Sequence, residues 1–174
     1  MDQPFVLTIL VVLIGFCLAA FFITLEALFG ELVEGITRSA EEKPGKAFWV
    51  GLVNMAFMAA FAIGLVSLAE TEYSVFGLVL AVPGFAVGVF VAVGVVFGLA
   101  GMVSLIAGRV FPGKEGWKLQ ASGSGVVILA CLVPYIGWFG LFPYLGLRGF
   151  GAFILHLMEL YRANRMRKQE ESPA

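Results

Sequence analysis

The residues that most often carry chemistry in proteins are scarce in this chain. His156 is the only histidine, and the two cysteines, Cys17 and Cys131, lie in separate apolar stretches. A single histidine cannot supply a bis-histidine haem, a three-histidine zinc site or two Glu-x-x-His motifs. The Gly-Ser-Gly sequence at 123–125 resembles neither a nucleophile elbow nor a phosphate-binding loop. The sequence therefore predicts that the chain is not an enzyme and holds no cofactor of its own.

Two interpretations of His156 remain open. It can pack as an interfacial or core histidine, or it can ligate a pigment or a metal that is shared between subunits. We favour the first, because no second histidine exists to complete a ligand pair within the chain.

Arg148 is the one basic residue inside an apolar block. Its guanidinium cannot lose its proton, and a charge in hydrocarbon is costly. If Pro143 opens the last helix and Tyr161 marks its inner boundary, Arg148 lies about 20 Å from the inner face at 1.5 Å per residue. It is then roughly 10 Å from the outer face of a 30 Å core. We predict that Arg148 pairs with Glu70 and Glu72 of an outer connector; the alternative is snorkelling to lipid phosphate.

The amino-acid composition predicts the kind of helices that carry His156 and Arg148. The chain is 60% hydrophobic and 13% charged, with a mean hydropathy of +0.98. A soluble domain is nearer half apolar and a quarter charged. The low-charge runs, each long enough for a spanning helix of roughly 20 residues, are 5–29, 47–69, 73–108 and 123–161. These observations predict an all-α integral membrane protein with one membrane domain over residues 1–174 and no nucleic-acid partner.

The basic residues predict the orientation of that domain. Cytoplasmic loops collect Lys and Arg, and ten of the eleven Lys and Arg residues lie in three segments, 38–46, 109–118 and 162–168. Residues 70–73 carry none, and none precedes Phe5. We expect a prokaryotic cytoplasmic (inner) membrane, with the N-terminus outside and the three basic segments inside. The absence of a preceding basic residue also favours a retained first span over a signal peptide.

This orientation fixes how often each block crosses the membrane. The third low-charge run, 73–108, begins outside and ends inside. The last run, 123–161, begins and ends inside, so the glycine- and proline-rich stretch 133–151 must contain a turn. We predict about five transmembrane helices, with breaks near Pro83 and over Pro134–Pro143. The alternative is four helices plus a re-entrant hairpin.

Residues 25–36 form an amphipathic segment that extends the first span. Its apolar residues recur with helical spacing, and its glutamates fall off that stripe. The stripe consists of Leu25, Leu28, Phe29, Leu32, Val33 and Ile36. It can pack on its own bundle or lie at the interface, or it can face a partner. The first domain segment is thus residues 1–46, followed by a helical bundle at 47–161 and a basic tail at 162–174.

Small residues recur every four positions in the third block. Gly84, Gly88, Gly94 and Gly98 form two Gly-x-x-x-Gly pairs. Such pairs allow close approach of helices. They predict packing within the chain or, alternatively, self-association.

Three stretches carry a resemblance to a known group of proteins. They are KAFWVGLVNM at 46–55, the AVPG break at 81–84 before AGRVFPG, and LVPYIGW at 132–138. Together they resemble the multi-spanning membrane segments that accompany bactofilin-type, polymer-forming bacterial proteins. The resemblance covers roughly residues 44–160 and implies an anchor or scaffold for a larger assembly. This chain lacks the soluble polymer-forming domain.

These observations predict a non-catalytic accessory, scaffold or anchoring subunit of a larger membrane complex. Its expected partners are membrane lipid and other membrane protein subunits. The alternative function is a small channel or transporter, which broken helices and Arg148 would suit.

Overall fold

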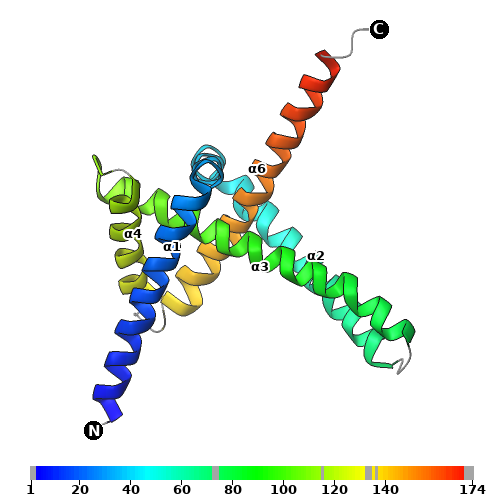
Figure 1. Cartoon of the computed structure of the whole chain (residues 1–174), viewed down its shortest axis with the longest axis horizontal. Helices are drawn as coiled ribbons and strands as arrows, with labels where there is room; N and C mark the ends of the chain where they lie inside the picture. The colour runs from blue at the N-terminus through cyan, green and yellow to red at the C-terminus, as the bar shows by residue number, and fades with distance from the viewer. Residues whose placement is uncertain (1–2, 72–74, 115, 132–134, 136, 171–174) are drawn as a thin grey trace.

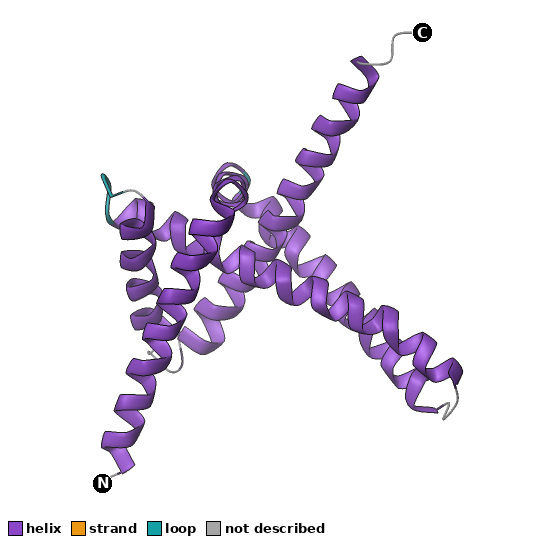
Figure 2. Cartoon of the chain, in the orientation of Figure 1, coloured by secondary structure: helices purple, strands orange, loops and turns teal. Residues whose placement is uncertain are grey.

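The computed structural model describes residues 3–71, 75–114, 116–131, 135 and 137–170, and those residues form helices joined by short turns (Figures 1 and 2). Among these described residues, four stretches are long and apolar enough to cross a membrane: Val12–Glu42, Pro44–Leu68, Ala81–Val110 and Phe139–Gln169. The predicted class, an all-helical chain suited to a membrane, is confirmed at this level.

Helix α1 spans Gln3–Glu42 and bends at Phe29, whose φ of −130° and ψ of 36° are not helical. Gly30 follows the bend, and glycine is a common cause of helix kinks. In Figure 1 the first part of α1 lies in the plane of the view, whereas its last turns are seen end-on. The predicted helical extension of the first span is present, but it runs in a new direction.

Helices α2, Pro44–Thr71, and α3, Val75–Val110, lie side by side as a hairpin (Figure 1). The break expected near Pro83 is wrong, since α3 continues through this proline as one helix. A Cβ on the neighbouring Gly84 would lie 3.3 Å from Leu65 Cβ, so α3 is packed on α2 at this level. Packing against a neighbouring helix is what allows a proline to remain inside a membrane helix.

The last block folds as two helices with an irregular join. Helix α4 spans Gly116–Cys131, a π-helical turn η1 spans Gly137–Leu141, and α6 spans Phe142–Glu170. Pro143 is the second residue of α6, close to the predicted opening position, where its missing N–H is not needed. Pro134 lies outside the described residues.

Helix α6 crosses both α2 and α3 with backbone touching backbone. A Cβ on Gly149 would lie 2.5 Å from the carbonyl carbon and oxygen of Gly98 on α3. A Cβ on Gly151 would meet the Ala47 carbonyl and lie 2.6 Å from the Gly51 nitrogen on α2. Glycine at these positions is therefore required by the crossing itself.

The buried core gathers around these crossings. Ile36, Met102, Leu145 and Phe153 bring α1, α3 and α6 together, and Ala47 adds α2. A second cluster joins α1 to α3 through Phe22, Val33, Ala100 and Val103. The core thus lies at the centre of the molecule, and the far ends of α1 and of the α2–α3 hairpin extend away from it (Figure 1).

Candidate functional site

The most site-like feature is a cavity of about 640 Å³ between α1, α3 and the start of α4. Most of its walls are apolar, but several polar side chains open onto it. Its lining residues include Glu26, Glu34 and Thr37 of α1, Ser104 of α3, and Trp117 of α4. A largely apolar cavity with a few convergent polar groups is the usual form of a small-molecule site.

Glu26 lines this cavity without a hydrogen-bond or ion-pair partner among the described residues. It is half-buried, and its Oε2 atom is buried with no hydrogen bond to any described residue. An unpaired carboxylate oxygen away from water costs free energy unless a proton or a cation accompanies it. Glu26 is therefore poised to interact with a positively charged or hydrogen-donating group.

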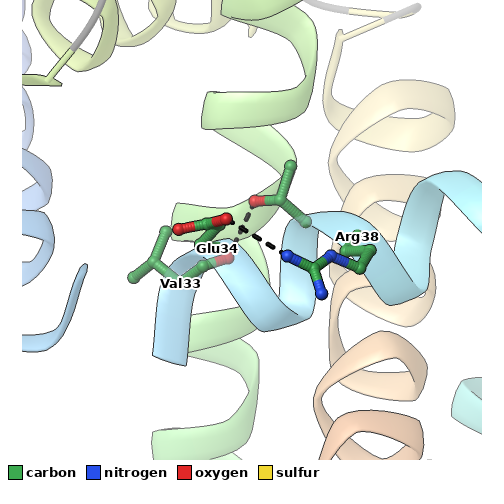
Figure 3. Close-up of polar contacts among 4 residues, drawn as sticks. Val33, Glu34 and Arg38 are labelled. Carbon is green, nitrogen blue, oxygen red and sulfur yellow. Dashed lines mark hydrogen bonds and ion pairs between the residues drawn. The ribbon is translucent and has the colours of Figure 1, made fainter. Parts of the chain in front are cut away.

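The neighbouring polar residues of α1 are already engaged. The Arg38 guanidinium lies 3.3 Å from the Glu34 carboxylate, one helical turn away, as the dashed line in Figure 3 shows. The Thr37 hydroxyl donates to the Val33 carbonyl at 2.8 Å and lies 3.2 Å from the Gly101 carbonyl on α3. The Glu34–Arg38 pair is mostly exposed, so it contributes little to stability.

A buried polar network joins α3 and α4 behind the cavity. The Ser104 hydroxyl donates to Gln120 Oε1 at 2.7 Å, and Gln120 Nε2 donates to the Ala100 carbonyl at 3.4 Å. Gln120 and Ser124, one turn apart on α4, are both fully buried. The Ser124 hydroxyl has no hydrogen bond to the described residues. The Gln120 side chain thus has a hydrogen-bond partner for its oxygen and for its nitrogen, whereas the Ser124 hydroxyl has none among the described residues.

This difference predicts opposite outcomes for two small substitutions. Ser124→Ala should leave the protein as stable as before or stabilise it by up to about 1 kcal/mol, because it removes an unpaired buried hydroxyl. Ser104→Ala should destabilise by about 1 kcal/mol, because Gln120 loses its donor. Unfolding of the detergent-solubilised variants, followed by circular dichroism, measures both. A larger loss for Ser124→Ala than for Ser104→Ala would contradict the network.

Arg148 forms a second polar junction, between α6 and the end of α1. Its Nη2 donates to the Ala40 carbonyl at 3.0 Å and its Nη1 to the Tyr144 hydroxyl at 3.1 Å. Ala40 is fully buried and lies in the last turn of α1, where carbonyls have no partner within the helix. Arg148 thus caps α1 with a positive charge, which is favourable at a helix C-terminus.

The structure favours this capping role over the predicted pairing of Arg148 with Glu70 and Glu72. Leu147, the residue before Arg148, lies against Gly51 near the start of α2. Glu70 is nineteen residues further along the same helix, roughly 28 Å at 1.5 Å per residue. Glu72 and the side chain of Glu70 lie outside the described residues.

His156 lies in a third contact between α1 and α6. Its imidazole ring fills the space that a side chain at Gly35 would occupy. One turn further on, the Glu159 carboxylate accepts a hydrogen bond from Lys43 Nζ at 2.7 Å. This hydrogen bond, together with the charge of Glu159, raises the pKa of Lys43. The described residues show no group of three histidine, cysteine, aspartate or glutamate side chains that could hold a metal.

The predicted amphipathic stripe divides at the bend in α1. Val33 and Ile36, after the bend, are 2% and 0% exposed in the core of the chain itself. Leu28 and Phe29, at the bend, are exposed. The partner-facing interpretation is therefore wrong for Val33 and Ile36, because the bend turns that part of the helix onto α3. Leu25 and Leu32 are half-buried beside them.

The four glycines predicted to allow close helix packing also differ in whether another helix lies against them. Gly94 abuts the Phe150 ring and Gly98 touches the Gly149 backbone, both on α6, while Gly84 faces α2. A Cβ at Gly88 would meet nothing within 4 Å. Packing within the chain is thus confirmed for three of the four glycines.

The sequence did not single out Gln120. The spacing of two polar residues could have indicated it. Gln120 and Ser124 are four residues apart, so they share one face of a helix, and the residues that flank each of them are small or apolar. A polar face on a short apolar helix indicates a buried network.

Over its described residues the chain is helical, with four helices that are each long and apolar enough to cross a membrane. Comparisons with protein-family models, with curated proteins and with solved structures found no match.

Proposed function

We propose that this protein is a non-catalytic accessory, scaffold or anchoring subunit of a larger membrane complex. The observation that carries the proposal is the poor burial of its first two spans. About 6% of the apolar core of each of these spans is buried within the chain, against 39% and 44% for the third and fourth.

The exposed faces of α2 are rich in large side chains. Phe57 and Phe61 stack at 6.3 Å between ring centroids on the outer face, and Ile63 is 66% exposed. In a bilayer such faces are covered by lipid or by other helices. A scaffold uses them to hold neighbouring subunits, whereas an isolated transporter needs its helices closed around a path.

The end of α6 supports an anchoring role. All described positions from Met158 to Gln169 are exposed, and this part of the helix projects from the bundle (Figure 1). It carries Arg162, Arg165, Arg167 and Lys168. A projecting basic helix suits contact with anionic lipid headgroups or with an acidic partner at the membrane surface.

We further propose five membrane crossings, with α4 as the short fourth one. The C-terminal ends of α1, α3 and α6 lie toward one end of the molecule in Figure 1, and those of α2 and α4 toward the other. This alternation is what five crossings require. The proposal of an N-terminus outside and basic segments inside, in a prokaryotic inner membrane, rests on the distribution of Lys and Arg. With 16 residues, α4 is short for a full span, and the re-entrant hairpin is the alternative.

Cysteine labelling tests this topology. In a background with Cys17 and Cys131 replaced by alanine, cysteines at Lys114 and Lys168 should react only with reagent on the cytoplasmic side. A cysteine at Glu72 should react only from outside. Labelling of positions 114 and 168 from opposite sides would contradict the five-span topology.

The resemblance to membrane segments that accompany bactofilin-type proteins supports the same function. It implies a membrane platform for a larger assembly.

Native mass measurement after mild extraction tests the function. The proposal predicts a particle heavier than the 18.7 kDa chain, with distinct membrane proteins present in fixed ratio. The alternative function, a small channel or transporter, predicts solute flux from the pure chain in liposomes. Flux from the pure chain without any co-purifying subunit would contradict the scaffold proposal.

A further inference from the structure

We propose that the cavity between α1, α3 and α4 binds the primary ammonium group of an amine-bearing phospholipid, with Glu26 as its anionic partner. The side chains that line this cavity would bind such a headgroup whether or not the protein acts as a scaffold.

Glu26 supplies the need for a cation. Its Oε2 atom is buried and has no hydrogen-bond partner among the described residues. The other cavity glutamate, Glu34, already has Arg38 at 3.3 Å. A primary ammonium offers one positive charge and three N–H donors, so it compensates both the charge and the unmade hydrogen bond.

The hydroxyl groups of Ser104 and Thr37 also line this cavity. Ser104 gives its hydrogen to Gln120, and Thr37 gives its hydrogen to the Val33 carbonyl. The oxygen lone pairs of both hydroxyls therefore remain available. Besides the Glu26 carboxylate, the lining of the cavity thus includes two hydroxyl oxygens that can accept hydrogen bonds from a bound molecule.

The size and walls of the cavity favour a lipid over a bare ion. About 640 Å³ far exceeds the roughly 30 Å³ that one water molecule occupies. Much of the wall is apolar, with Ile23, Ala27, Val33 and Leu119 among its residues. Such a wall suits the methylene groups of a glycerolipid.

The rim of the cavity carries the opposite charge. Trp117 lines the cavity and is 63% exposed, and Lys118 Nζ lies 5.8 Å from the centre of its ring. A positive charge beside the cavity suits the phosphate of a lipid headgroup.

Native mass spectrometry of the full-length chain tests this proposal. The probes are phosphatidylethanolamine and phosphatidylcholine with identical acyl chains, because the choline headgroup keeps the charge but has no N–H donor. Wild-type protein should retain phosphatidylethanolamine at least about fivefold over phosphatidylcholine. Glu26→Gln should abolish this preference, whereas Glu31→Gln, an exposed glutamate on the same helix, should keep it.

A series of N-methylated phosphatidylethanolamines provides a test that needs no variant. Retention by the wild-type chain should fall stepwise as each N–H is replaced by methyl. Equal retention of all headgroups, or an unchanged preference in a folded Glu26→Gln variant, would overturn the proposal. Binding of free ethanolamine without retention of phosphatidylethanolamine would overturn the lipid as the source of the ammonium.

Discussion

Replacing Gly149 by alanine should destabilise this protein far more than replacing Gly146, although both glycines lie on α6. A Cβ at Gly149 would lie 2.5 Å from backbone atoms of Gly98, which cannot rotate away as a side chain can. The expected loss is about 3 kcal/mol or more, the upper end of what overpacking costs. Gly146→Ala meets nothing within 4 Å, and alanine favours the helix, so it should be neutral or stabilising by up to about 1 kcal/mol.

Reversible unfolding in mixed detergent micelles measures both changes. A second pair on α3 provides an independent control, since Gly98 faces α6 and Gly88 faces open space. Gly98→Ala should resemble Gly149→Ala, and Gly88→Ala should resemble Gly146→Ala. Equal tolerance of Gly149→Ala and Gly146→Ala would mean that α3 and α6 do not cross at these glycines.

The second large effect is expected at Arg148. Arg148→Leu should destabilise by about 2 kcal/mol, because the Ala40 carbonyl loses a charged donor at a position where water cannot replace it. Arg165→Leu, on the exposed end of α6, should change stability by less than about 0.5 kcal/mol. The same unfolding measurement compares the two.

A double substitution separates the capping role from the pairing that the sequence suggested. If Arg148 caps α1, adding Glu70→Leu to Arg148→Leu should restore none of the lost stability. Recovery of a substantial part of it would show instead that Glu70 is the partner of Arg148.

The sequence could predict the helical membrane class because that information is local. Low charge over roughly 20 residues is sufficient to recognise a span. The glycine spacing at Gly94 and Gly98 predicted close packing for the same reason, since the required feature is a missing side chain.

The partners of Arg148 could not be predicted because they depend on a crossing. From the sequence, only the depth of Arg148 along a straight spanning helix can be calculated. The structure instead crosses α6 over the start of α2, with Gly151 against Ala47. This crossing brings Arg148 to the end of α1, and no local pattern in α6 reveals it.

The bend at Phe29 is a second feature that could not be predicted, and it decides which residues of the 25–36 stripe are buried. A continuous helix over 25–36 would place all six stripe residues on one face. The bend changes the direction after Phe29, so Val33 and Ile36 enter the core while Leu28 stays outside. Glycine at position 30 was visible in the sequence, but the direction of the turn depends on packing against α3.

Photo-crosslinking from the outer face of α2 tests the scaffold function most directly. A benzoyl-phenylalanine at Phe57, which is 69% exposed, should crosslink in cells to one or a few membrane proteins of defined mass. The same probe at Met102, which is 2% exposed, should crosslink only within the chain. If position 57 gives only lipid adducts in the native membrane, the proposal that this chain holds other subunits is contradicted.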